Sequence, residues 1–348
     1  MSKIKEKNTP EQDLDLFSQR KSIIPTEMRV YLPNWENKPR HTRNIITANN
    51  GEIILAKSGG HFCVCAKAGV GKSSIVEAII SSHISKHTDS FSIDISLYDF
   101  RNKILVLDTE RSQGETWEAW ERLARRSGMQ EPEEMQSIIF ANIKALALAD
   151  KRKFVDEIML KNDDIGMVVF DGSSDFVADV NNGIEANNFI EWLNTFHPYI
   201  STIHTIHTNP SDDKPRGHLG SELLRRASGV LLAKRIEDGV VQLTSNFDNG
   251  KVRWGSHFTT HFSYNSDAEM MLSVDFTPPT RKTQENEEKY VQMAKEIYGH
   301  HTHLFFADIV DGIMKALNKN KGACEQVFNR HFKNKIVIKD GANGWLMK

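Results

Sequence analysis

The chain has 348 residues, with 44 Lys and Arg against 46 Asp and Glu and a formal net charge of -2. This balance excludes binding to nucleic acid through the overall charge, so any site for DNA has to be a local basic patch. No apolar run approaches the roughly 20 residues that span a membrane, and the polar residues 1–20 do not form a signal peptide, so we expect a cytoplasmic protein with no membrane partner.

The chain divides into four predicted regions. Residues 1–44 are expected to form an N-terminal tail or arm. In residues 45–276, short β-rich runs alternate with helical stretches, which indicates an α/β fold with a mostly parallel sheet and helices on both faces. Residues 277–283 contain the stiff sequence Thr277-Pro278-Pro279-Thr280 and are a predicted linker. Residues 284–348 are expected to form a small second domain.

The large domain has recognisable strands and helices. Cys63 and Cys65 alternate on its first strand and are expected to be buried thiols. The predicted strands are Phe62–Cys65, Ile104–Asp108, Ile138–Asn142, Met167–Asp171, Ile203–Thr208, Val230–Lys234 and Val240–Leu243. The predicted helices include Glu115–Arg126 and Lys151–Leu160.

Residues 66–74 match the phosphate-binding loop of nucleotide triphosphatases, in which Ala or Gly precedes four residues and then Gly-Lys-Ser or Gly-Lys-Thr. The loop requires a strand before it and a helix after it, and residues 61–65 and 73–80 have those patterns. Lys72 is expected to reach the β- and γ-phosphates of ATP, and the Ser73 hydroxyl to ligate Mg²⁺. A glycine-rich turn that binds nothing is the alternative. The residues predicted to bind the nucleotide are Ala66, Lys67, Ala68, Gly69, Val70, Gly71, Lys72, Ser73 and Ser74.

Two carboxylates that would complete such a site follow later strands. Asp171 ends a buried strand, and ligands bind at the carboxyl ends of parallel strands, so we expect Asp171 beside Mg²⁺ with Ser73. An aspartate that only caps the next turn is the alternative. Glu110 lies just past the strand that ends at Asp108, where a carboxylate can hold the attacking water. Asp108 competes for this role, and a plain loop carboxylate is the alternative for both.

Four motifs occur in order over residues 45–255: the phosphate loop, Asp108-Thr109-Glu110, Asp171 and Ile206-His207-Thr208-Asn209. Together they resemble the RecA-like ATPases, and most closely the RepA-type branch of plasmid and mobile-element hexameric helicases. The resemblance implies a RecA-like fold with ATP and Mg²⁺ as cofactors. It also implies that Glu110 is the catalytic base and that His207 senses the γ-phosphate and is linked to DNA-binding loops. From the residues alone, His207 is equally an ordinary histidine at a strand end.

In RecA-like proteins, two loops that here would follow Asp171 and His207 line the channel of a ring. In the second loop, Lys214 and Arg216 are candidate contacts to DNA phosphates. Asp212 and Asp213 cancel that charge, and the loop has no aromatic residue on which a base could stack. A solvated surface loop is the alternative.

The resemblance also implies a homo-oligomeric ring, expected as a hexamer, in which a cation reaches the γ-phosphate of the neighbouring subunit. Lys251 and Arg253 follow the strand at residues 240–243, about where members of the family place this Lys or Arg finger. Arg225 and Arg226 are other candidates. The alternative is that Lys251 and Arg253 are only solvated charges at the end of a hairpin.

Residues 284–348 are predicted to form a winged helix. Helices are expected at Gln284–Ile297, His303–Leu317 and Gly322–Phe332, the third in the recognition position, and residues 335–347 as the wing hairpin. Lys and Arg dominate residues 315–339, which suits a duplex phosphate backbone, although winged helices also dock proteins. The predicted DNA contacts in this domain are Lys321, Arg330, Lys333 and Lys335.

The resulting hypothesis is an ATP-hydrolysing, helicase-like DNA motor that acts in replication or mobilisation of a mobile genetic element. One alternative is an ATP-switched DNA-binding regulator without unwinding activity. Another is a P-loop kinase of a small molecule, against which the Asp-Thr-Glu segment argues.

Overall fold

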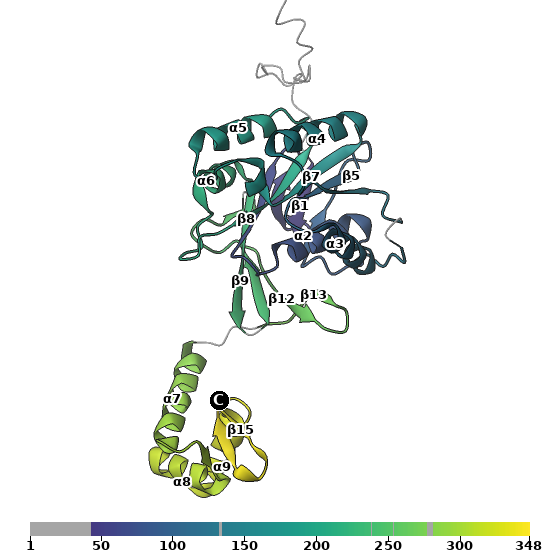
Figure 1. Cartoon of the computed structure of the whole chain (residues 1–348). Helices are drawn as coiled ribbons and strands as arrows, with labels where there is room; N and C mark the ends of the chain where they lie inside the picture. Colours follow the sequence, from purple (N-terminus) through teal and green to yellow (C-terminus); the bar gives the residue numbers. More distant parts are fainter. Residues whose placement is uncertain (1–42, 132–133, 238, 253, 277–280) are drawn as a thin grey trace, which may run out of the picture. The chain divides into compact units, whose positions relative to one another are not determined.

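The computed structural model describes residues 43–131, 134–237, 239–252, 254–276 and 281–348, apart from the side chains of 281–287 and 343. The chain forms two compact units that divide between Asp275 and Phe276 (Figure 1). Residues 1–42 of the predicted tail, residues 277–280 of the predicted linker and the candidate finger Arg253 lie outside the described residues.

The first unit is built on one large sheet. Within the described residues its strand order is β13-β12-β10-β9-β3-β8-β7-β5-β6, and β11 pairs with β9. The strands from β9 to β6 in this order pair in parallel, whereas β10, β11, β12 and β13 pair antiparallel. The expected α/β fold class with a mostly parallel sheet is therefore confirmed. The strands are β3 (His61–Ala66), β5 (Lys103–Asp108), β6 (Ile138–Asn142), β7 (Ile165–Asp171), β8 (Ser201–His207), β9 (Gly229–Glu237), β10 (Val240–Thr244), β11 (Lys251–Val252), β12 (Thr259–Asn265) and β13 (Met270–Ser273).

Helices cover both faces of the sheet because successive strand residues point to opposite sides. Phe62 and Val64 of β3 belong to the apolar core shared with α2 and α3, and Cys63 and Cys65 belong to the core shared with α4, α5 and α6. Figure 1 shows α2 and α3 on one side of the sheet and α4 and α5 on the other. All four strand residues are fully buried, and the expectation of buried thiols is confirmed. The helices are α2 (Lys72–Ile84), α3 (Gln113–Arg126), α4 (Leu148–Lys161), α5 (Gly183–Leu193) and α6 (Gly217–Arg226).

The start of α3 is fixed by a capping box, which also ends the loop that carries Glu110. The Glu115 amide donates to Ser112 Oγ at 3.3 Å, and the Ser112 amide donates to Glu115 Oε2 at 2.7 Å. These bonds satisfy backbone groups that the first turn of a helix leaves unpaired. They hold the chain that runs from β5 into α3.

A second sheet in this unit was not predicted from the sequence. It is antiparallel and has the order β2-β1-β4. Ile46 of β1 and Leu55 of β2 are fully buried in the same core as α2. The strands are β1 (Asn44–Ala48), β2 (Ile53–Lys57) and β4 (Ile93–Ile95).

The second unit packs helices around its own apolar core, which includes Ile309, Phe328 and Phe332, beside an antiparallel sheet of order β14-β16-β15. Two predicted elements need correction. Residues 303–304 form a strand before the helix rather than part of it, and residues 328–332 form a turn of π-helix rather than the end of one regular recognition helix. The elements are α7 (Arg281–Tyr298), β14 (His303–Leu304), α8 (Phe306–Leu317), α9 (Lys321–Val327), η4 (Phe328–Phe332), β15 (Val337–Lys339) and β16 (Trp345–Met347). Across the described residues, no helix has the length and apolar character needed to cross a membrane.

Candidate nucleotide site

The loop between β3 and α2 has the geometry of an anion-binding turn. Gly69 and Gly71 have φ angles of 76° and 105°, which favour glycine, and Gly71 is the N-cap of α2. No side chain caps this end of α2. The amides of the first helical turn therefore point into the loop, where a phosphate is bound favourably by these donors and by the helix dipole. The predicted residues 66–74 thus fit a phosphate group.

Register in the parallel sheet brings the other predicted residues to the same edge. Ala66 at the end of β3 pairs with His207 at the end of β8, and Asp108 at the end of β5 pairs with Asp171 at the end of β7. Parallel strands place their carboxyl ends on one side of the sheet, next to the loop that follows β3.

The predicted metal ligands Ser73 and Asp171 lie close to each other. Burial raises the pKa of Asp171, while the charge of Arg111 and hydrogen bonds from Ser73 and Thr205 lower it. Thr205 Oγ1 donates to Asp171 Oδ1 at 3.0 Å and accepts from the Gly172 amide at 2.8 Å. A hydroxyl and a carboxylate beside a phosphate loop are hard oxygen donors, so these residues fit Mg²⁺.

His207 connects the lysine of the phosphate loop to the predicted base. Lys72 Nζ lies 3.1 Å from His207 Nδ1, and His207 Nε2 lies 3.4 Å from Glu110 Oε1. An imidazole with its hydrogen on Nε2 accepts from Lys72 and donates to Glu110. That hydrogen bond is the main reason why the pKa of Glu110 is lowered, and burial lowers the pKa of Lys72. Glu110 is therefore ionised at neutral pH, and His207 bridges it to Lys72.

Asp108, the competitor for the role of base, is held inside the fold. Its side chain is 1% exposed, against 51% for Glu110. Its Oδ1 accepts from the amides of Glu110 and Arg111 at 3.2 and 3.1 Å, and its Oδ2 accepts from Thr116 Oγ1 at 2.8 Å. Asp108 therefore shapes the loop, whereas the Glu110 carboxylate is half exposed and contacts His207.

Sequence reasoning missed three charged residues beside the site, namely Glu77, Arg111 and Arg122. Arg111 NH2 donates to Asp171 Oδ2 at 3.3 Å and to Glu77 Oε1 at 3.2 Å, and Arg122 also donates to Glu77. The available signal was Glu77 itself, a carboxylate within an apolar stretch of the helix after the phosphate loop, where a buried charge needs a partner.

The predicted DNA residues Lys214 and Arg216 are exposed on the loop after β8, and that loop is tied to the site. The Arg216 amide donates to the carbonyl of His207 at 2.8 Å, and Lys67 Nζ donates to the carbonyl of Pro210 at 2.9 Å. The loop is thus bonded both to the phosphate loop and to His207. In the second unit, the predicted contacts Lys321, Arg330, Lys333 and Lys335 are all exposed.

The finger candidates that the structure describes, Lys251, Arg225 and Arg226, lie near the amino end of β9. Lys251 pairs with Val230, and its Nζ donates to the carbonyl of Arg225 at 3.3 Å. Arg225 donates to Glu222, and the charge of Arg226 acts on His61 at the start of β3. Within one chain, Lys251, Arg225 and Arg226 therefore do not lie at the edge of the sheet that carries the loop after β3.

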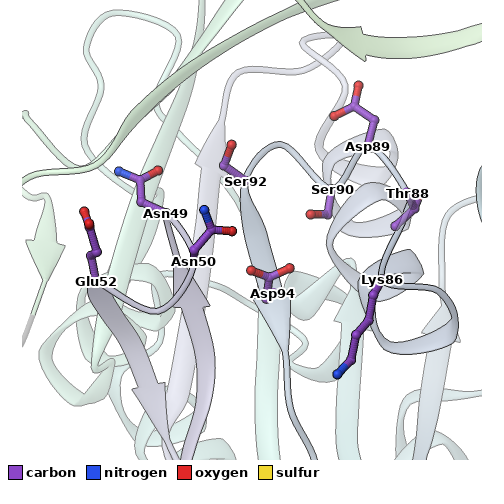
Figure 2. A pocket seen from close by; sticks show the side chains of 9 residues that line it. All are labelled: Asn49, Asn50, Glu52, Lys86, Thr88, Asp89, Ser90, Ser92 and Asp94. Atoms are coloured by element: carbon purple, nitrogen blue, oxygen red, sulfur yellow. The ribbon is translucent and has the colours of Figure 1, made fainter.

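A polar pocket of about 540 Å³ lies elsewhere, between the β1–β2 turn and the chain after α2, and contains none of the predicted site residues (Figure 2). Its lining includes the carboxylates of Glu52, Asp89 and Asp94. Asp89 accepts from the amide and hydroxyl of Ser273, so this carboxylate joins two segments of the first unit.

No family model and no curated protein matches the chain. Among solved structures it is similar to a KaiC-like protein from the hyperthermophilic archaeon Pyrococcus horikoshii OT3, with 11% identity and a TM-score of 0.45, over 68% of this chain and 100% of that one.

Proposed function

We propose that the chain is an ATP-hydrolysing, RecA-like DNA motor of the helicase-like type, acting in replication or mobilisation of a mobile genetic element. The observation that carries the proposal is the convergence of Lys72, Glu110, Asp171 and His207 at one edge of the sheet, next to a loop shaped for phosphate. The resemblance to RepA-type helicases supplies the biological role.

Each side chain has a role that its surroundings support. Lys72 and the loop amides would bind the phosphates. Ser73 and Asp171 would hold Mg²⁺, which would neutralise charge on the β- and γ-phosphates. Glu110 orients the attacking water, because its carboxylate is ionised and half exposed just past β5. His207 contacts both Lys72 and Glu110 and would sense the γ-phosphate from this position.

Two backbone contacts would carry this change to DNA. The loop that holds Lys214 and Arg216 is bonded to His207 through the Arg216 amide and to the phosphate loop through Lys67. A shift of His207 or Lys67 on hydrolysis therefore displaces the loop. In a ring, this loop would move along the DNA backbone.

We further propose a homo-oligomeric ring, expected as a hexamer, in which Lys251 or Arg253 reaches the ATP of a neighbouring subunit. Residues 284–348 are proposed as a winged helix that contacts DNA through Lys321, Arg330, Lys333 and Lys335. The order helix, strand, helix, helix, strand, strand supports this assignment.

The test is ATP turnover with and without single-stranded DNA, on the wild type and on Glu110→Gln, with the oligomer mass followed in parallel. Stimulation by DNA is expected, together with a loss of turnover of about 100-fold or more in Glu110→Gln while ATP binding persists. Arg125→Gln, a change at an exposed arginine of α3, is the matched control and should turn over ATP normally.

An ATP-switched DNA-binding regulator without unwinding is the second candidate. One observation favours it: Asp213 of the loop after β8 pairs with Lys234 at 3.2 Å, which reduces the positive field available to single-stranded DNA. ATP turnover that ignores single strands, combined with tight duplex binding, would replace the motor by this switch.

A further inference from the structure

Glu77 is a buried carboxylate to which the proposed ATP chemistry assigns no role. It lies on α2, about one helical turn beyond Ser73, and its side chain is 6% exposed. Burial raises its pKa, while hydrogen bonds and charge from Arg122 and the charge of Arg111 act in the opposite direction. A carboxylate in such a place is retained as an anion only when cations compensate its lost hydration.

Two arginines provide that compensation, and they come from different segments. Arg122 of α3 donates through Nε to Glu77 Oε2 at 3.2 Å and through NH2 to Oε1 at 3.1 Å, a two-point contact. Arg111, in the loop after β5, donates through NH2 to Oε1 at 3.2 Å. Glu77 thus connects the phosphate-loop helix to the loop that carries Glu110.

Arg111 also reaches the carboxylate proposed to hold the metal. Its NH2 lies 3.3 Å from Asp171 Oδ2, and its NH1 lies 3.5 Å from Asp108 Oδ2. The same nitrogen, NH2, is therefore shared between Glu77 and Asp171. Arg111 is 15% exposed, so these interactions are weakly screened by water and sensitive to a change of one charge.

Arg111 lies next to the proposed base in the chain, so its double contact with Glu77 and Asp171 is relevant to catalysis. It directly follows Glu110, and both of their amides donate to Asp108 Oδ1. A movement of the Arg111 guanidinium away from Asp171 therefore acts on the same short loop that presents the proposed base.

We propose that Arg111 is a positioning residue that competes with Mg²⁺ for Asp171, and that Glu77 sets the strength of this competition by holding the same guanidinium. The inference rests on the proposed ATP site. Glu77 draws Arg111 toward α2 and leaves Asp171 Oδ2 available to the metal. When Glu77 is neutralised, Arg111 stays on Asp171 and more Mg²⁺ is needed.

The measurement is binding of the fluorescent N-methylanthraniloyl derivative of ATP to the full chain at increasing Mg²⁺, which needs no turnover. Arg111→Gln removes the competing cation, so the Mg²⁺ concentration for half-maximal binding should fall about three- to tenfold. Glu77→Gln removes the competing anion, so that concentration should rise by about the same factor. Arg125→Gln, at an exposed arginine of α3, should leave it unchanged.

The double variant Glu77→Gln/Arg111→Gln shows whether Glu77 acts through Arg111. If it does, the double variant has the Mg²⁺ requirement of Arg111→Gln alone, because no guanidinium remains for Glu77 to hold. Additive shifts mean that Glu77 acts directly through its own charge, and the proposal is then wrong. A purely structural role is excluded by shifts of opposite sign in the two single variants, since general loosening of the site weakens binding in both.

Glu77→Gln keeps the side-chain size and both arginines, so it tests the proposal even if Arg111→Gln does not fold. A fall or no change in its Mg²⁺ requirement overturns the inference. If the wild type fails to bind the ATP derivative with Mg²⁺, the proposed function fails as well. Wild-type Mg²⁺ dependence in every variant removes only the role of Arg111 and Glu77.

Discussion

Two histidines in the sheet of the first unit make its stability sensitive to acid. His61 Nδ1 lies 2.7 Å from Thr202 Oγ1, and the same hydroxyl lies 2.8 Å from His204 Nε2. His204 is fully buried and stacks on Phe170 with ring centroids 5.0 Å apart. Burial lowers the pKa of His61 to about 4 and the pKa of His204 well below its usual value. Both imidazoles are therefore neutral in the folded protein at neutral pH.

The sign and size of the effect follow from proton linkage. Above pH 6.5, His61 is neutral in the folded and unfolded chains and contributes nothing. Between pH 6.5 and 4 the unfolded chain takes up a proton that the folded chain does not, so stability falls as the pH falls, and below pH 4 the loss is complete. With these pKa values, His61 alone removes about 2 kcal/mol from the free energy of unfolding at pH 5. His204 adds a loss in the same direction.

The assay is urea unfolding at pH 7 and pH 5, followed by tryptophan fluorescence. His61→Asn keeps a polar atom near Thr202 but cannot be protonated, so its loss of stability between the two pH values should be about 2 kcal/mol smaller than that of the wild type. The same replacement at the exposed His87 is the control. Equal losses in His61→Asn and in the wild type would refute the reasoning.

Three further predictions test the surroundings of the site. Gly172 has a φ of 104°, and a Cβ there would lie 2.1 Å from Thr109 Oγ1. Gly172→Ala should therefore lower the free energy of unfolding by about 1–3 kcal/mol, and an unchanged urea midpoint would contradict this. Ser112→Ala removes half of the capping box with Glu115 and should lower the free energy of unfolding by about 1 kcal/mol in the same assay. A loss below a few tenths of a kcal/mol would show that the cap contributes little to stability. Burial raises the pKa of the Cys65 thiol to about 12, so Ellman's reagent at about pH 8 should label it only after unfolding, and rapid labelling of the native protein would contradict its burial.

Much of the first unit could be predicted from local patterns. Each predicted strand was found within three residues of its expected ends, because continuous apolar runs of that length are characteristic of strands buried on both faces. The second sheet was missed because its three strands are short, and because β4 pairs with β1 only through contacts between residues that are distant in the chain. Residues 328–332 were expected to continue a helix, but their π-helical turn buries Phe328 and Phe332 together in the core.

For the predicted site, the placement of residues followed from the sequence, but their contacts did not. Asp171 and Glu110 could be placed at one edge because both follow parallel strands, and the register at Asp108 and Asp171 agrees with that rule. Their individual surroundings could not be predicted. Nothing in the order of residues shows that Asp108 accepts from two amides and a hydroxyl while Glu110 faces His207.

By itself, the sequence determined the phosphate loop, the α/β class and the strand ends where polar residues gather, because these depend on glycine conformations, apolar periodicity and chain direction. Only the tertiary structure decided that Arg111 shares one nitrogen between Glu77 and Asp171. Those carboxylates are 94 residues apart in the chain and come from a helix and a strand. Contacts of this kind arise when the fold brings the loop after β5 within hydrogen-bond distance of both α2 and the end of β7. A buried charge then pairs with the partner that the packing places next to it.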